Sequence, residues 1–198
     1  MRIAILTFEG CNEMDSFVAL SMLNRIRRPG WKAEITSPEP VVTSMCGVRI
    51  ERQQPLSFAR AADAVIVGSG RLTREIVADP LIMGELQLDP SRQLIAAQCS
   101  GALVLAKLGH LKGQPVCTDV MTKPWVVEAG ATVIEKPFHV SGNVATAGGC
   151  LASHYLAAWI VARSIGREAA EELLAYVTPV GEQEAWASRA LAVIQPYV

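Results

Sequence analysis

The feature that most constrains this chain is the stretch at residues 94–109, which reads LIAAQCSGALVLAKLG. Its first four residues are an apolar run bounded by polar residues, and this predicts a buried β-strand. The next four, Gln-Cys-Ser-Gly, predict a turn, and the apolar residues after them predict a helix. A nucleophile between a strand and a helix sits on a sharp turn that lifts its side chain out of the sheet. The stretch therefore predicts a nucleophile elbow in an α/β protein.

Cys99 is the residue placed on this turn. The first amides of the following helix carry partial positive charge, so we expect them to acidify the thiol and make it nucleophilic. The Ser100 amide is expected to hold a developing oxyanion, while Ser100 also caps the helix and Gly101 allows close approach of the chain. The alternative is an inert, packed cysteine, which is the more common state of this residue type. The position of Cys99 at the carboxyl end of a strand favours a ligand site over a packed cysteine, because open α/β sheets bind ligands at these ends.

The composition excludes several classes of function. The chain has 198 residues, 51% of them hydrophobic, and a net charge of −1, so it offers no electrostatic attraction for nucleic acid or an anionic membrane. No apolar run reaches the length of a membrane span, and the N-terminus is expected to be a strand, not a signal peptide. The chain has five cysteines, an odd number, and no CxxC motif. This pattern favours reduced thiols in the cytoplasm and argues against a metal site.

Short apolar strands alternate with helices along most of the chain, which predicts a parallel sheet covered on both faces. Strands are expected at residues 2–8, 31–37, 64–67, 94–97, 115–118 and 132–135, and hairpins at residues 41–52 and 138–146. Helices are expected at residues 14–28, 58–62, from 72, from 80, at 125–128, 150–165, 168–175 and 183–194. No linker or internal repeat interrupts this order, so residues 1–198 are expected to form one domain.

Four stretches together carry a resemblance to a known family. They are RIAILTFEGCNEMD at the start, DAVIVGSG in the middle, QLIAAQCSGALVLAKLGHLKG at the elbow and GNVATAGGCLASHYLAAWIV near the end. The chain resembles the DJ-1/PfpI superfamily, also called class I glutamine amidotransferase-like. The resemblance implies a flavodoxin-like three-layer sandwich and a homodimer. It is nearest the isocyanide hydratase and regulator-domain branch, because an Asp follows the first strand and a small hydroxyl residue follows the cysteine.

The resemblance also assigns candidate site residues. Cys99 matches the elbow nucleophile, Asp15 the carboxyl that faces it, and Gly70 and Ser100 the residues whose amides face the same pocket. Glu13 is the competing carboxyl, two positions earlier.

One aromatic residue is a further candidate for the site, and the histidines are not. Trp125, downstream of the elbow, is a candidate pocket wall. The protease-like branch has a His directly after the nucleophile, and here that place is Ser100, which argues against protease activity. His110, His139 and His154 are expected to be structural.

These residues predict a cysteine-dependent hydratase, lyase or hydrolase-like enzyme that uses no cofactor. Cys99 attacks a small electrophile such as an isocyanide or an aldehyde, and Asp15 delivers and recovers the proton. One alternative is a redox sensor in which Cys99 is oxidised, with Cys11 as a candidate resolving thiol. Another is a small-molecule-binding module without turnover. Cys46, Cys117 and Cys150 are expected to be structural.

Overall fold

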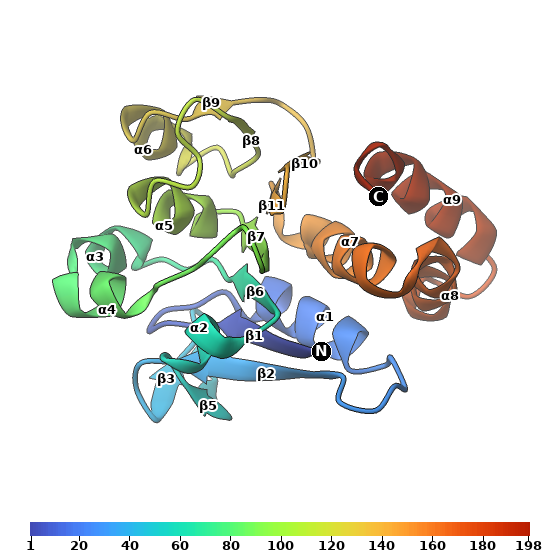
Figure 1. The fold of residues 1–198 in the computed structure, drawn as a ribbon, viewed down its shortest axis with the longest axis horizontal. Helices are drawn as coiled ribbons and strands as arrows, with labels where there is room; N and C mark the ends of the chain where they lie inside the picture. Colours follow the sequence, from blue (N-terminus) through green and yellow to red (C-terminus); the bar gives the residue numbers. More distant parts are fainter.

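The protein is described by a computed structural model of residues 1–198, which has a central seven-stranded sheet between two layers of helices (Figure 1). The strand order is β10-β11-β7-β6-β1-β2-β5. All neighbouring pairs are parallel except the hairpin of β10 and β11. The strands are β1 (Arg2–Leu6), β2 (Lys32–Ser37), β5 (Gln54–Pro55), β6 (Ala64–Val67), β7 (Leu94–Gln98), β10 (Phe138–Ser141) and β11 (Val144–Ala147). This is the mostly parallel, flavodoxin-like α/β fold that the sequence predicts.

The sheet is buried on both faces, and successive residues of each strand supply two separate cores. Ile3 and Ile5 of β1 belong to one apolar cluster, while Ala4 and Leu6 belong to the other. The first core lies under α1 (Glu13–Leu23), α7 (Ser153–Ile165), α8 (Arg167–Val177) and α9 (Gln183–Ile194). The second lies under α2 (Phe58–Ala61), α3 (Thr73–Ala78), α4 (Pro80–Glu85), α5 (Gly101–Lys107) and α6 (Lys123–Glu128). Figure 1 shows α7–α9 and α3–α6 on opposite sides of the strands.

Two small sheets and two short 3₁₀ helices complete the fold. They are the hairpin of β3 (Val41–Thr43) and β4 (Arg49–Glu51), the parallel pair β8 (Pro115–Val116) and β9 (Thr132–Val133), η1 (Cys150–Ala152) and η2 (Gln195–Tyr197). Both predicted hairpins are confirmed. The edge strand β5 has no apolar alternation and was not among the expected strands.

Two helix boundaries differ from the expected ones by three residues or more. The helix expected at residues 14–28 ends at Leu23, because the Asn24 side chain bonds both the N–H and the C=O of Ala33, at 2.9 Å each. Trp31 Nε1 also donates to the carbonyl oxygen of Leu23 at 2.8 Å, so the chain turns toward β2 there. The helix expected from residue 150 begins with the 3₁₀ turn η1, and α7 follows from Ser153.

The sheet brings four connecting segments to one edge. β6 lies between β1 and β7, and β11 pairs with the other side of β7 with Ala147 opposite Gln98. Parallel strands end at the same edge, so the residues that follow β1, β6, β7 and β11 lie close together. The Cys11–Gly70 backbone bridge joins two of these segments directly. This edge is where the candidate site forms.

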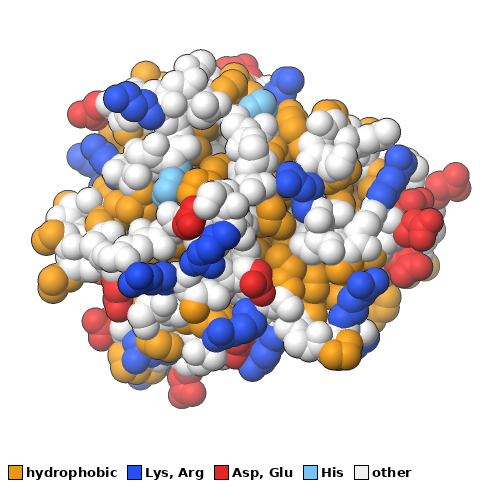
Figure 2. All heavy atoms as spheres, in the orientation of Figure 1, with side chains coloured by type: hydrophobic (Ala, Val, Ile, Leu, Met, Phe, Trp, Pro, Cys, Tyr) orange, Lys and Arg blue, Asp and Glu red, His pale blue; other side chains and the backbone are white.

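The surface agrees with the near-zero net charge. Figure 2 shows acidic and basic side chains interspersed over much of one face, with apolar side chains between them. No helix combines the length and the apolarity that a membrane crossing requires.

Candidate functional site

The elbow at Cys99 has a strained backbone. Cys99 follows the last residue of β7, precedes α5 by two positions, and has a φ of 45°, the one positive φ among the non-glycine residues. Its N–H donates to the Ala147 oxygen at 2.8 Å, and Thr118 Oγ1 donates to its carbonyl oxygen at 2.8 Å. A Cβ at Gly101 would lie 2.4 Å from the Val67 oxygen, so the helix can start this close to β6 only with glycine. The surrounding backbone therefore holds the conformation in place.

Asp15 is the carboxyl that faces the thiol. It lies in the first turn of α1, whose start is capped by Asn12 Oδ1 accepting from the Met14 N–H at 3.1 Å. Only 1% of Asp15 is exposed. Ser69 Oγ donates to its Oδ2 at 2.5 Å, and Ser153 Oγ donates to its backbone oxygen at 2.5 Å. Burial raises the pKa of Asp15 to about 6, although hydrogen bonds from Ser69 and Ser16 oppose this shift.

Cys150 completes a cluster of three ionisable side chains. One carboxylate oxygen of Asp15, Cys99 Sγ and Cys150 Sγ all lie within 4.8 Å of one another. Asn12 Nδ2 donates to Cys150 Sγ at 3.1 Å, and Gln98 Nε2 donates to Cys99 Sγ at 3.3 Å. The two sulfur atoms are thus held by amide donors from two different segments of the same edge.

The expected acidification of Cys99 is wrong. Only 5% of the residue is exposed, and burial raises the pKa of its thiol to about 12. The Gln98 amide lowers this pKa, but the charge of Asp15 raises it further. Desolvation of the charged form therefore outweighs the helix amides. At neutral pH the thiol is protonated and Asp15 is mostly ionised, so the proton rests on the sulfur and not on the carboxyl.

The Ser100 side of the elbow is a closed hydrogen-bonded network. The Gly70 N–H donates to Ser100 Oγ at 3.0 Å, Ser100 Oγ donates to the Gly70 oxygen at 3.2 Å, and Thr73 Oγ1 lies 2.8 Å from Ser100 Oγ. The Gly70 amide is thus engaged by a side chain and is not free to face the pocket as expected. The Ser100 side chain does not cap α5, because it is used here. The Ser100 amide itself forms no hydrogen bond.

The remaining sequence candidates lie away from the cluster. Glu13 is partly exposed, and a hydrogen bond from Cys46 lowers its pKa, so Asp15 is the acid beside Cys99. Trp125 lies on α6, packs against the second core and has the Arg74 guanidinium 4.7 Å from its ring centroid. Cys11 is buried, and its backbone pairs with Gly70, outside the sulfur cluster.

The histidines do not join the three side chains. His139 Nδ1 lies 3.1 Å from the Tyr197 hydroxyl, and His154 Nδ1 bonds the Leu151 oxygen.

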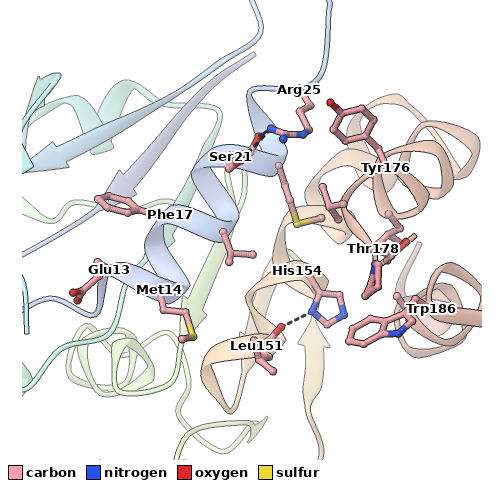
Figure 3. A pocket seen from close by; sticks show the side chains of 16 residues that line it. Glu13, Met14, Phe17, Ser21, Arg25, Leu151, His154, Tyr176, Thr178 and Trp186 are labelled. Carbon is pink, nitrogen blue, oxygen red and sulfur yellow. Dashed lines mark hydrogen bonds between the residues drawn. The ribbon is translucent and has the colours of Figure 1, made fainter. Parts of the chain in front are cut away.

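Besides a narrow crevice lined by Cys11, Ser69 and Gly70 that has no room for water, two cavities adjoin the site, and neither of these two is lined by Cys99. The larger, about 720 Å³, is a mostly apolar groove between α1 and the helices α7–α9 (Figure 3). Figure 3 shows Met14 on one side of this groove and His154, Tyr176 and Trp186 on the other. The second cavity, about 530 Å³, is lined by Gly149, Cys150 and residues of α7 and α9. Cys150 is therefore the member of the cluster that borders open space.

Sequence reasoning did not identify Cys150, Gln98 or Asn12 as part of the site. Two thiols and a carboxylate are also ligands that soft divalent metals accept. The side chains of Asp15, Cys99 and Cys150 are therefore the group that could hold a metal ion. The spacing of the cysteines in the chain gave no such indication. The signal that was available is the end of β11, which a parallel pairing with β7 brings next to the elbow.

Comparisons with known proteins agree with this architecture. The model of the DJ-1/PfpI family matches residues 1–163. Protein dj-1beta of Drosophila melanogaster is 25% identical over 170 residues, covering 83% of this chain and 89% of that protein. A ThiJ/PfpI family protein from Pseudomonas syringae superposes with a TM-score of 0.79 at 21% identity, covering 97% of this chain and 89% of that one. Schizosaccharomyces pombe DJ-1 superposes with a TM-score of 0.77 at 13% identity, covering 90% and 100%. The chain belongs to the DJ-1/PfpI family.

Proposed function

We propose that this protein is a cysteine-dependent enzyme in which Cys99 attacks a small electrophilic molecule and Asp15 handles the proton. The observation that carries the proposal is the proximity of these two groups: a carboxylate with 1% exposure lies within 4.8 Å of a thiol on a strained elbow. Such a pair provides a nucleophile and a base in one enclosed place. The family membership supports a cysteine-dependent role, and residues 1–198 would act as one domain.

The protonation states define the direction of the mechanism. Because the resting thiol is neutral and Asp15 is ionised above about pH 6, Asp15 takes the thiol proton as sulfur attacks the electrophilic carbon. The resulting neutral carboxyl then returns the proton to the adduct. The free Ser100 amide is the donor available for negative charge on the adduct. Water releases the product and restores the thiol.

Hydration of an isocyanide, in which water releases a formamide from the thioimidate, fits these requirements, and so does reversible addition of the thiol to an aldehyde. Both molecules are small and neutral, which suits an almost buried sulfur, and both carry an electrophilic carbon. The Asp after the first strand and the Ser after Cys99 support the isocyanide hydratase branch, while the lack of a histidine beside the sulfur argues against a protease.

The test measures turnover of an aryl isocyanide and of a 2-oxoaldehyde as the loss of substrate over time. We expect Cys99→Ser to abolish turnover and Asp15→Asn to reduce it by about 10²- to 10⁴-fold, the usual contribution of a positioned base. The rate of the unmodified protein should increase with pH through about 6, as Asp15 loses its proton. Cys117→Ser is the matched control, because Cys117 is equally buried but lies outside the cluster. Turnover that survives in Cys99→Ser would eliminate the mechanism.

We further propose that the protein forms a homodimer and acts in the cytoplasm. Support for the dimer comes from the apolar groove, whose rim includes the exposed side chains of Met14, Leu151, Tyr176 and Trp186. Support for the location comes from the five free thiols. Light scattering after size exclusion should give twice the chain mass, and Met14→Glu should reduce it. An unmodified protein that elutes at the chain mass would refute the dimer.

A further inference from the structure

We infer that Cys99 and Cys150 are a redox pair that closes into a reversible intramolecular disulfide when a hydroperoxide enters the cavity beside Cys150. The first observation is proximity: their sulfur atoms lie within 4.8 Å of each other, although the residues are far apart in the chain. None of the other three cysteines belongs to this group. The pair arises because β11 and β7 end side by side, with Ala147 opposite Gln98.

The second observation is the difference in access between the two thiols. Cys99 is 5% exposed and lines neither cavity, whereas Cys150 is half-buried and borders the cavity of about 530 Å³. A small oxidant in this cavity therefore meets Cys150 first, with Cys99 behind it. This order differs from a scheme in which Cys99 is oxidised and Cys11 resolves it.

The third observation is the backbone at Cys150, which permits the closing movement. A disulfide needs a sulfur–sulfur distance of about 2.05 Å, so one sulfur must move by up to a few ångströms. Cys150 begins the 3₁₀ turn η1, directly after Gly149, which is exposed and has a φ of 88°. The Asn12 amide that bonds Cys150 Sγ is the one side-chain hydrogen bond to be broken there. Cys99, by contrast, is fixed by the elbow.

The reaction balances as two steps. The hydroperoxide transfers one oxygen to Cys150, so that the thiol becomes a sulfenic acid and the peroxide is reduced to an alcohol or water. Cys99 then attacks the Cys150 sulfur and gives its proton to Asp15, and Asp15 passes this proton to the sulfenic hydroxyl, which leaves as water. The two sulfur atoms have together lost two electrons to the peroxide. Two equivalents of a small thiol reductant reverse the bond.

The inference rests on the proposed function in one respect, because both use Cys99 as the nucleophile and Asp15 as its base. The electrophile differs: here it is the Cys150 sulfenic sulfur. The consequence is that the oxidised protein is inactive but protected. The disulfide blocks attack on substrate and also keeps Cys99 from irreversible oxidation to sulfinic acid.

The experiment treats the full chain with one equivalent of hydrogen peroxide, blocks free thiols under denaturing conditions with N-ethylmaleimide, and maps the peptides by mass. We expect a peptide pair linked through Cys99 and Cys150, with no added oxygen, that dithiothreitol separates. Cys150→Ser and Cys150→Ala should form no such link and should gain oxygen on Cys99 at higher peroxide. Cys11→Ser is the control, because Cys11 is the other thiol considered for this role, and it should keep the link.

Two outcomes overturn the inference. One is added oxygen on the unmodified protein without the linked peptides, and the other is a link from Cys99 to a different cysteine. Turnover separates this failure from failure of the proposed function. Peroxide should not reversibly shut off whatever turnover Cys150→Ser has before treatment, whereas Cys99→Ser should lose turnover and the disulfide together.

Discussion

The two sides of the elbow are each built from three small residues, yet their energetics are opposite. On the Ser100 side, which comprises Gly70, Thr73 and Ser100, the hydroxyls and the Gly70 N–H bond one another at 2.8–3.2 Å. On the Cys150 side, which comprises Asp15, Cys99 and Cys150, a carboxylate is desolvated and a backbone is strained. The adjoining Gln98 Oε1 is buried with no hydrogen-bond partner.

The difference shows how one turn serves stability and chemistry separately. A satisfied polar network contributes to stability and rigidity, whereas a desolvated acid and a positive φ each cost free energy. Reactive sites commonly carry such costs, because a group whose charge and hydrogen bonds are fully satisfied has little tendency to react. If this division is right, substitutions on the Cys150 side should stabilise the protein, and substitutions on the Ser100 side should destabilise it.

Asp15→Asn should give the largest effect, a gain in stability. The pKa of Asp15 is about 6 in the folded protein and 3.8 in its ordinary state, so the folded protein binds more protons between these values. The free energy of unfolding therefore falls as pH rises from about 4 to 6 and stays lower above that, by about 3 kcal/mol. Asn lacks the charge, so the gain should be up to about 3 kcal/mol at pH 7 and vanish near pH 4.

Urea denaturation at pH 4 and pH 7 measures this gain. Glu13→Gln is the matched control, since Glu13 occupies the same helix turn but is partly exposed, and it should change stability by only about 0.5 kcal/mol. An Asn variant that is no more stable than the unmodified protein at pH 7 would show that Asp15 carries no desolvation cost.

Ser100→Ala should give a loss of intermediate size. The substitution leaves the Gly70 N–H without its partner in a part of the protein where Ser100 itself is 8% exposed. A donor that loses its acceptor costs about 1–3 kcal/mol when it is buried, and Gly70 is partly buried, so the cost should lie inside this range. We expect the unfolding free energy to fall by about 2 kcal/mol. In a double-mutant cycle, Thr73→Val should cost less in the Ser100→Ala background than alone, because the two hydroxyls share a bond. Additive losses would mean that the network is not coupled.

The sequence predicts the architecture well because its signals are local. The apolar runs that became β1, β6 and β7 are buried on both faces, and the glycines and prolines between elements mark their ends. The position of Cys99 on a turn between β7 and α5 followed from the same pattern. The end of α1 did not, because it depends on the Asn24 side chain bonding Ala33 in the next strand.

The chemistry of the site was harder to predict, because it depends on burial and on distant residues. Helix amides favour a low pKa for Cys99, and only the packed structure shows that desolvation outweighs them. Cys150 lies far from Cys99 in the sequence, and no motif links the two residues. Their proximity comes from the register in which β7 pairs with β11. The Gly70 amide was assigned to the pocket, but the Ser100 hydroxyl, whose rotamer no sequence pattern specifies, bonds it instead.

The smallest effect should be the difference in unfolding free energy between Cys99→Gly and Cys99→Ala. This difference isolates the backbone strain at Cys99. Both variants remove the sulfur and its buried thiol, so they share the same loss of side-chain contacts beyond Cβ. Only Ala keeps a Cβ at a φ of 45°, a conformation that costs a non-glycine residue roughly 1–2 kcal/mol. We therefore expect the Gly variant to be more stable than the Ala variant by about 1 kcal/mol in chemical denaturation.

The same change three positions later provides the opposite control. Ala102 lies in the first turn of α5 with an ordinary helical backbone, so Ala102→Gly should destabilise by about 0.5–1 kcal/mol. A sign reversal between positions 99 and 102 would locate the strain at the nucleophile itself. Equal signs would mean that the elbow relaxes once the sulfur is gone, and that the thiol's own packing, and not the fold around it, imposes the positive φ.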